Sequence, residues 1–538
     1  MISTLLVANR GEIAVRIFRT CRELGIAAVA VVAPDDRHSL HARIADETVE
    51  IAGYLDSEEH IRAARQAGAD AIHPGYGFLA ENPDFAAAVE AAGLIFVGPT
   101  PEALRAGGDK LEAKRIAQEA GVPVLPSGDP SEIGFPLMVK AAAGGGGRGM
   151  RVVHHESELE DALGAARREA KAAFGDDRVF CERFVERPRH VEVQLLGDGS
   201  GRVVSLGERE CSIQRRHQKV LEESPSPALD DELRARVSAA ASALGSALGY
   251  RSAGTVEFMF DEATEEFSFL ELNGRIQVEH PVTELVTGLD LVRAQLNLAA
   301  GQQLDGVAPD PYGHAVEVRL YAEHPRTFLP QAGRIERLRL PETIRVDRGV
   351  DEGDEVPVAY DPMIAKLIAH GATRREALDR LRAALAETEV GGLVTNLPFL
   401  RWLVTHPEVG AGRTTTAFLV DHPPLSAPPA PVPAPWRGAF RLNLPPPERR
   451  PPPDIEETTH GHGPGAERSA LTAPMPGTVI RVVVEPGQRV KPRETLLVLE
   501  AMKMETPVVS PYEAVVKALH VREGDQVAGG ALLVELEE

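Results

Sequence analysis

Residues 136–150, Pro-Leu-Met-Val-Lys-Ala-Ala-Ala-Gly-Gly-Gly-Gly-Arg-Gly-Met, join a short apolar run to four consecutive glycines. Successive glycines let backbone N–H groups approach and wrap a polyphosphate without interference from side chains. Lys140 directly precedes the loop, and Lys110 follows a Gly-Gly-Asp, so both lysines are placed to neutralise phosphate oxygens. The stretch is neither a Walker loop, which needs Gly-Lys-Ser/Thr, nor a dinucleotide fingerprint, because no helical pattern starts inside the glycines. We therefore predict a phosphate-binding loop, with a flexible hairpin tip as the alternative, at Gly144, Gly145, Gly146 and Gly147.

A second pattern, further along the chain, pairs two carboxylates. Residues 255–260 and 267–273 are apolar-rich runs separated by an acidic turn, which predicts a β-hairpin. Glu257 and Glu271 then fall opposite each other about the centre of the turn. Opposed carboxylates repel unless a cation lies between them, and oxygen ligands near a phosphate loop are typical of Mg²⁺. We predict a metal site; two solvated glutamates are the alternative.

Polar and apolar residues alternate directly after this hairpin. Arg275, Gln277 and Glu279 are separated by single apolar residues, so on a strand they would share one face. That face would form a pocket for a small anion with a base beside it. Upstream, residues 208–219 add a dense cationic cluster, whose Cys211 we interpret as a packed thiol rather than a nucleophile.

The N-terminal segment predicts alternating strands and helices. Leu5–Ala8 and Ala27–Val32 are apolar runs, and Ile13–Leu24 between them has helical spacing. This βαβ pattern predicts a parallel sheet covered by helices. Strands and helices continue to mix over residues 110–422, so we assign the main part of the chain to the α/β class.

Composition narrows the possible functions. The 538 residues carry 58 basic and 80 acidic side chains, a formal net charge of −22, and their number predicts three or four domains. The acidic balance argues against binding of nucleic acid and against docking to an anionic membrane. The 3 cysteines are too few for a disulfide framework. With no signal-peptide or membrane-spanning pattern, these features favour a soluble, cytoplasmic protein.

Proline marks a break near the C-terminus. Fourteen of the 42 prolines fall between Pro423 and Pro464, which predicts a linker rather than a domain over residues 423–470. As a flexible coil such a linker would span about 40 Å, and proline stiffening would extend it further.

The remaining C-terminal residues contain an internal repeat. A shift of 37 positions aligns Pro474 with Pro511 and Gly487 with Gly524, together with apolar positions of both halves. Each half has a β-branched run, a turn and a second apolar run, which predicts a small all-β module with approximate two-fold symmetry. Residues 501–509 belong to neither half, and Lys503 lies at their turn.

Taken together, these motifs resemble the biotin carboxylase family of ATP-grasp enzymes, followed by a biotin carboxyl carrier domain. Further matching stretches are residues 5–14 (LLVANRGEIA), 73–79 (HPGYGFL), 188–192 (PRHVE) and 273–280 (NGRIQVEH). The resemblance implies a Rossmann-like domain at 1–108, an ATP-grasp domain at 109–315 with a glycine-rich lid at about 127–186, a C-terminal carboxylase domain at 316–422, the linker at 423–470, and an all-β biotinyl/lipoyl-like barrel at 471–538.

The resemblance also implies roles for the residues that match family motifs. The ATP-binding set is the glycine loop with Lys110, Lys140, Glu182, His190, Gln214 and His217. The positions of Mg²⁺ or Mn²⁺ ligands are Glu257, Glu271 and Asn273. The bicarbonate pocket is Lys219, Arg275, Gln277 and Val278, with Glu279 as the general base. Arg345 matches the arginine that steadies deprotonated biotin.

Elementary chemistry agrees with these implied roles. Bicarbonate is a weak nucleophile, so a base that removes its proton promotes attack on the γ-phosphate of ATP. The resulting carboxyphosphate is unstable in water, and a glycine-hinged lid would shield it. A fixed guanidinium can then stabilise the oxyanion of biotin.

The C-terminal repeat resembles biotin carriers more than lipoyl domains. Glu500-Ala-Met-Lys503-Met-Glu505 is similar to a biotinylation site with Lys503 as the acceptor, whereas lipoyl domains usually present Asp-Lys-Ala. Two positions depart from the family pattern: Gly274, where proline, threonine or alanine is commoner, and Ala143, which replaces a glycine. Neither departure removes a charged group, so activity is expected.

The resemblance implies the biotin carboxylase/carrier subunit of an acyl-CoA carboxylase, with acetyl-CoA or propionyl-CoA as the expected acceptor. No stretch of these 538 residues is left for a carboxyltransferase, so a separate carboxyltransferase (beta) subunit is expected. A biotin protein ligase and a homo-oligomer within a larger complex are also implied. The alternatives are a carboxylase subunit for another acceptor such as methylcrotonyl-CoA, an ATP-grasp ligase for another acid with a lipoyl-like appendage, and a catalytically idle carrier scaffold.

Overall fold

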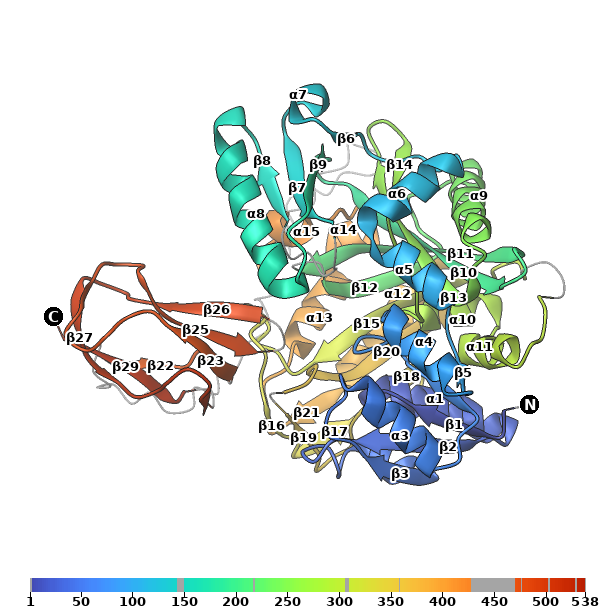
Figure 1. Cartoon of the computed structure of the whole chain (residues 1–538), viewed down its shortest axis with the longest axis horizontal. Coiled ribbons are helices and arrows are strands. Elements are labelled where there is room, and N and C mark those ends of the chain that lie inside the picture. The colour runs from blue at the N-terminus through green and yellow to red at the C-terminus, as the bar shows by residue number, and fades with distance from the viewer. Residues whose placement is uncertain are drawn as a thin grey trace, which may run out of the picture.

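The computed structural model describes residues 2–142, 150–215, 218–304, 309–357, 359–426, 470–475, 477–501, 504–527 and 530–537. Some predicted features lie outside these ranges: the glycine loop with Ala143, His217, most of the linker, and Lys503. The described residues form a large main body, residues 2–426, and a C-terminal module, residues 470–537, that stands to one side of it (Figure 1).

The N-terminal part of the main body is the predicted βαβ unit, extended to a five-stranded parallel sheet. Its strand order is β3-β2-β1-β4-β5. Helix α1, Gly11–Leu24, buries Ile13, Ile17 and Cys21 along one stripe and ends at Gly25, whose φ of 70° is the left-handed conformation that glycine adopts readily. The strands are β1 (Thr4–Val7), β2 (Ala27–Val32), β3 (Glu47–Glu50), β4 (Ala71–His73) and β5 (Ile95–Phe96). The further helices are α2 (Leu40–Ile44), α3 (Ser57–Gln66), α4 (Pro83–Ala91), α5 (Pro101–Gly108) and α6 (Lys110–Glu119).

An antiparallel sheet of eight strands forms the centre of the main body. Its order is β14-β13-β10-β11-β12-β15-β20-β18. The strands are β10 (Arg189–Asp198), β11 (Val203–Arg215), β12 (Gln218–Ser224), β13 (Arg251–Asp261), β14 (Glu266–Asn273), β15 (His314–Tyr321), β18 (Arg345–Arg348) and β20 (Met363–Gly371). The predicted hairpin is β13–β14. Strand β15 runs across the expected domain boundary at 315/316, so one continuous sheet joins the two expected domains.

A smaller four-stranded sheet, the lid sheet, stands apart from the central sheet (Figure 1). Its order is β6-β9-β7-β8. The elements are β6 (Ser127–Gly128), α7 (Pro130–Ile133), β7 (Leu137–Ala141), β8 (Arg151–Val153), the 3-10 turn η1 (Glu156–Glu158), α8 (Leu159–Phe174) and β9 (Val179–Arg183). Strand β7 contains the apolar run that precedes the glycine stretch in the sequence.

Helices and two small β-ribbons complete the main body. The helices are α9 (Asp231–Ala247), α10 (His280–Thr287), α11 (Leu291–Ala299), α12 (Arg374–Glu387), α13 (Leu397–Thr405), α14 (Pro407–Gly410) and α15 (Phe418–Asp421). The ribbons pair β16 (Gly333–Arg334) with β19 (Glu355–Val356) and β17 (Arg337–Arg339) with β21 (Glu389–Gly391). Within the described ranges, no helix combines the length and the apolar character needed to cross a membrane.

The C-terminal module confirms the repeat. Two four-stranded sheets, β22-β29-β27-β24 and β26-β25-β23-β28, enclose one apolar cluster. The strands are β22 (Ala470–Thr472), β23 (Gly477–Val482), β24 (Arg489–Val490), β25 (Thr495–Ala501), β26 (Met504–Val509), β27 (Ala514–Leu519), β28 (Gln526–Val527) and β29 (Leu532–Glu537). The same 37-residue shift carries β23 onto β27 and β24 onto β28. Residues 502–503 join β25 to β26, whose last described pair is Ala501 with Met504.

Candidate active site

A cavity of about 2130 Å³ is lined by residues of both the central sheet and the lid sheet. Every predicted site residue that the structure describes lines it, with one exception, Arg345. These residues are Lys110, Lys140, Glu182, His190, Gln214, Lys219, Glu257, Glu271, Asn273, Arg275, Gln277, Val278 and Glu279. The fold therefore gathers side chains from positions as far apart in the sequence as 110 and 279 into one space.

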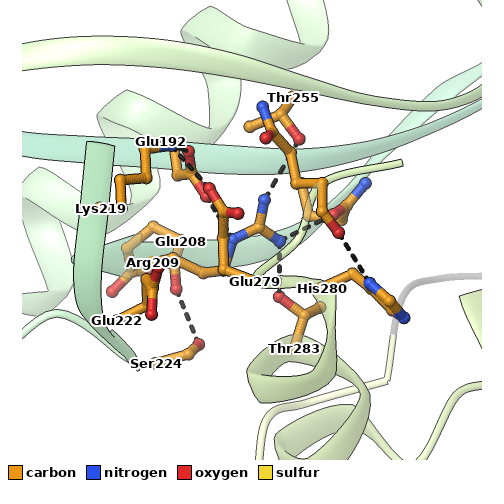
Figure 2. A network of polar contacts seen from close by, with 12 residues as sticks. Glu192, Glu208, Arg209, Lys219, Glu222, Ser224, Thr255, Glu279, His280 and Thr283 are labelled. Atoms are coloured by element: carbon orange, nitrogen blue, oxygen red, sulfur yellow. Dashed lines mark hydrogen bonds and ion pairs between the residues drawn. The ribbon is translucent and has the colours of Figure 1, made fainter. Parts of the chain in front are cut away.

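Lys219 and Glu279 lie at the centre of this cavity. The Lys219 Nζ lies 2.6 Å from Glu279 Oε1 and 3.0 Å from Glu257 Oε1, and it also contacts Glu192 (Figure 2). The second oxygen of Glu279 accepts a hydrogen bond of 3.0 Å from Arg319. Burial would raise the pKa of Glu279, but Lys219 and Arg319 hold it well below its usual range. This carboxylate is therefore ionised at neutral pH.

A buried arginine behind the cavity, which is not among the predicted site residues, fixes these groups. Arg209 on β11 donates to Glu192 Oε1 at 2.5 Å, to Thr283 Oγ1 at 3.0 Å and to Thr255 Oγ1 at 3.2 Å (Figure 2). Glu192 thus bridges Arg209 and Lys219. A fully buried charge is stable only when it is paired in this way. The sequence signal for Arg209 is its place within the cationic cluster that we noted at 208–219.

The predicted strand over residues 275–279 is wrong. Strand β14 ends at Asn273, and an irregular segment leads from there into α10. The backbone N–H of Gly274 donates to Glu81 Oε1 at 2.9 Å, where a continued strand would pair with its neighbour. Alternation of residue types alone does not reveal this competing partner, because Glu81 is almost two hundred residues distant in the sequence.

The polar side chains of this segment still converge on the cavity. Arg275 donates to Gln277 Oε1 at 3.0 Å and to Asn273 Oδ1 at 3.1 Å, and its Nε donates to Glu81 at 3.0 Å. The guanidinium is thereby held in one orientation beside Glu279, as an anion pocket requires.

The structure gives a reason for Gly274, one of the two departures from the family pattern. A Cβ atom built on this residue would lie 2.6 Å from Cδ2 of Leu104, which is buried in the core beneath it. The backbone of Gly274 approaches that core closely, so glycine suits this packing.

Glu257 and Glu271 face each other directly across β13 and β14, as predicted. Burial and the neighbouring charge of Glu257 raise the pKa of Glu271, and Lys110 opposes this rise. Asn273 donates to Glu257 Oε1 at 2.8 Å. A divalent cation beside Glu271 would relieve the repulsion, so two carboxylates and an amide oxygen fit Mg²⁺ or Mn²⁺.

On the lid side, two lysines share one glutamate. Lys140 on β7 and Lys114 on α6 both donate to Glu182 on β9. Burial would raise the pKa of Glu182, but these two lysines lower it below its usual value. Lys114 was not among the predicted site residues. The sequence feature that could have indicated it is its spacing of four residues from Lys110 along one helix, which places both lysines on one face.

His190 and Gln214 connect the lid side to the carboxylate pair. His190 Nε2 lies 2.7 Å from Glu257 Oε2, and its Nδ1 lies 3.2 Å from the Gln214 amide nitrogen. Burial would lower the pKa of His190, but Glu257 raises it above its ordinary value. The raised pKa favours the charged form of the His190 ring beside the pocket.

Arg345 does not lie with these residues. It is paired with Glu284 at 2.7 Å and with Asp347 at 2.7 Å, outside the cavity. The arginine that contacts Glu279 is Arg319 on β15, which also contacts Glu222 at 2.5 Å. In this structure, therefore, Arg319 and not Arg345 lies with the predicted site residues.

The cysteines fit the interpretation of packed thiols. Cys21, Cys181 and Cys211 are all buried and free. Burial, with a smaller contribution from Glu192, raises the pKa of the Cys211 thiol well above its usual range, which disfavours the nucleophilic thiolate.

Comparison with known domain families agrees with this geometry. Residues 1–104 match the biotin carboxylase N-terminal domain, and residues 317–421 match the biotin carboxylase C-terminal domain. Residues 109–307 match the ATP-binding domain of the carbamoyl-phosphate synthase L chain. Residues 469–536 match the domain of biotin-requiring enzymes.

Individual relatives give the same result. A biotin carboxylase from Halalkalibacterium halodurans is 47% identical over 450 residues, which cover 78% of this chain and 98% of that protein. The propionyl-CoA carboxylase alpha chain of Ruegeria pomeroyi is 46% identical, with 79% of this chain and 68% of that protein covered. A biotin carboxylase structure from Campylobacter jejuni superposes with a TM-score of 0.77 at 40% identity and covers 78% of this chain and 99% of that one.

The chain therefore belongs to the biotin carboxylase family. It is a biotin carboxylase fused at its C-terminal end to a biotin carrier domain, homologous to acyl-CoA carboxylase alpha chains. The predicted resemblance and fold class are confirmed.

Proposed function

We propose that this chain uses ATP and bicarbonate to carboxylate biotin attached to Lys503 of its own C-terminal module. The observation that carries the proposal is the meeting of Lys219, Glu279 and Arg319 beside the Glu257–Glu271 pair in one cavity. An anion pocket, a base and a metal-binding carboxylate pair are the parts that the reaction needs.

Glu279 would act as the general base. Its low pKa keeps it ionised while Lys219 and Arg319 face it. When bicarbonate binds, the anion shares the positive charge of Lys219 and Arg275, so the proton affinity of Glu279 rises at the moment when a proton is to be taken up. The deprotonated bicarbonate would then attack the γ-phosphate of ATP, breaking the bond to the bridging β–γ oxygen, so that carboxyphosphate forms and ADP leaves.

Two lysines and a metal ion would neutralise the negative charge of the ATP phosphates. Lys110 and Lys140 line the cavity where a polyphosphate would lie. Glu257, Glu271 and Asn273 would hold Mg²⁺ or Mn²⁺, which supplies charge neutralisation to the phosphates. The glycine loop Gly144–Gly147, Glu182, His190, Gln214 and His217 complete the proposed nucleotide set.

Arg319 would stabilise negative charge on the acceptor. Its guanidinium lines the cavity, contacts Glu279 and is also paired with Glu222. We therefore assign to Arg319 the role that the sequence suggested for Arg345. Arg275 and Gln277 would orient the bicarbonate.

The proposed partner is a separate carboxyltransferase subunit, with a biotin protein ligase acting on Lys503. This is supported by similarity to the alpha chain of propionyl-CoA carboxylase and to the alpha subunit of methylcrotonoyl-CoA carboxylase from Dictyostelium discoideum, 46% identical, of which the chain covers 65%. We propose an acyl-CoA as the acceptor of the carboxyl group, within a homo-oligomeric assembly. The buried free cysteines support a reducing, cytoplasmic setting.

The direct test measures ATP cleavage by the purified, biotinylated chain. We expect cleavage to depend on bicarbonate and to rise with free biotin. Glu279→Gln should lower this rate about 100- to 10,000-fold without loss of folding. A biotinylated but ATPase-silent wild-type chain would contradict the proposal and would support a carrier scaffold. Lys503→Ala should abolish streptavidin binding while free-biotin-dependent cleavage persists.

A further inference from the structure

A short loop of the main body, residues 323–330, follows β15 and closes on itself. Glu323 and Pro330 form a β-bridge, and the His324 N–H donates to the Leu329 carbonyl at 2.9 Å. Phe328 adopts a φ of 57°, which is unusual for a bulky residue, and packs edge-on against Phe399 at 4.9 Å between ring centroids. The loop is thereby anchored in the core of the main body. We call it the docking loop.

The docking loop is fixed relative to the catalytic cavity. Arg215, at the end of β11, lies over the Phe328 ring at 4.9 Å and donates to the Phe328 carbonyl at 2.5 Å. It also contacts Glu323 at 3.1 Å. Its sequence neighbour Gln214 lines the cavity, as does Arg215 itself. Arg215 therefore both lines the cavity and supports the docking loop.

Leu329 points from this loop to the C-terminal module. It packs against the apolar cluster of that module, whose other members come from residues 471 onward. Leu329 is only half-buried, although its neighbour Phe328 is inserted into the main body. An apolar side chain held out from an anchored loop onto another domain is typical of a contact surface.

The C-terminal module also reaches the catalytic cavity itself. Arg481 on β23 and Glu500 near the end of β25 line the same cavity as Glu279 and Arg319. Figure 1 shows the β25–β26 hairpin directed at the main body. Lys503 follows Glu500 by three residues in the sequence.

We propose that the docking loop, with Leu329 at its contact point, receives the C-terminal module of the same chain for carboxylation. The proposal rests on the proposed function, because it names the surface at which the biotinylated module is presented to the site. A contact centred on one leucine is small, and small interfaces form weak, transient associations. Weak docking suits a carrier that must leave again for a second active site.

The test compares two rates in the full-length, biotinylated chain. The first is transfer of labelled bicarbonate onto protein-bound biotin, and the second is bicarbonate-dependent ATP cleavage with free biotin. Leu329→Asp should lower the first rate about tenfold or more, because a charge replaces the half-buried apolar contact with the module. The second rate should remain at the wild-type value, since free biotin needs no docking.

Two controls sharpen this result. Leu329→Met retains an apolar side chain of similar size and should keep both rates. Leu55→Asp alters an exposed leucine, 63% accessible, in the N-terminal part of the chain and should change neither rate.

Two outcomes would overturn the docking proposal: an unchanged first rate in Leu329→Asp, or an equal fall of both rates, which would place the effect at the catalytic site. If the wild-type chain showed no bicarbonate-dependent ATP cleavage with free biotin, the proposed function itself would be overturned. The two failures are therefore distinguishable.

Discussion

At the scale of single residues, two arginines differ in whether they contact Glu279, the proposed base. Arg319 and Arg345 both lie on strands of the central sheet, and both are paired with carboxylates. Only Arg319 contacts Glu279. Arg345 instead neutralises Glu284 and Asp347, so its contribution is to the packing of the main body.

Substitution of the two arginines should therefore separate catalysis from stability. Arg319→Gln should lower kcat of biotin carboxylation about 100-fold or more, because it removes a fixed charge from the pocket. Arg345→Gln should leave kcat near the wild-type value but lower the free energy of unfolding by about 1–3 kcal/mol. Glu284 and Asp347 each lose one of two arginine partners, since Arg16 still pairs with Glu284 and Arg19 with Asp347. Steady-state kinetics and thermal unfolding of both variants measure the difference. An equal loss of kcat in both would argue against our assignment.

At the scale of elements, the docking loop contains a buried acid. Glu323 is 5% exposed, and burial raises its pKa to about 7 in spite of its contact with Arg215. In the unfolded chain a glutamate releases its proton near pH 4.5. Between these two values the folded state holds a proton that the unfolded state has lost, so this residue makes stability fall as the pH rises.

Glu323→Gln should remove this pH dependence. The amide does not ionise, so the apparent Tm of the variant should fall less than that of wild type between pH 4.5 and 7. The difference corresponds to at most about 3 kcal/mol, from 1.36 kcal/mol per pKa unit. Differential scanning fluorimetry across this range measures it, with the exposed Glu342→Gln as a control that should follow wild type. Parallel curves for Glu323→Gln and wild type would rule out the effect.

At the scale of the whole molecule, the C-terminal module lies against the cavity of its own chain. A tether raises the effective concentration of the module at that cavity to the millimolar range, far above micromolar chain concentrations in solution. Carboxylation within one chain should therefore be much faster than carboxylation between chains.

Mixing two complementary variants tests this expectation. Lys503→Ala retains the carboxylase site but not the biotin acceptor, whereas Glu279→Gln retains the acceptor but not the base. At micromolar concentration, labelled bicarbonate should enter biotin in the mixture about 100-fold more slowly than in wild type. The residual rate should rise with chain concentration. Labelling at the wild-type rate would show that the module serves a neighbouring chain.

Much of this protein was determined by local sequence. The alternation in residues 255–273 was enough to place Glu257 opposite Glu271, because side chains on paired strands face each other at fixed spacing. The 37-residue repeat likewise predicted the symmetric C-terminal module, since each half carries its own turns and apolar runs.

Only the tertiary structure decided which distant groups meet. The backbone of Gly274 bonds to Glu81 and ends the strand, which no local pattern indicates. Arg319 lies near Glu279 because β15 is directly beside β12, which carries Lys219, the partner of Glu279. Strand β18, which carries Arg345, lies at the edge of the sheet beyond β20. At about 4.8 Å per strand this order puts β18 about 14 Å from β12. Sheet order is set by pairing between strands that are distant in the sequence. The sequence therefore determines which charged groups are present, and the tertiary structure determines which of them come into contact.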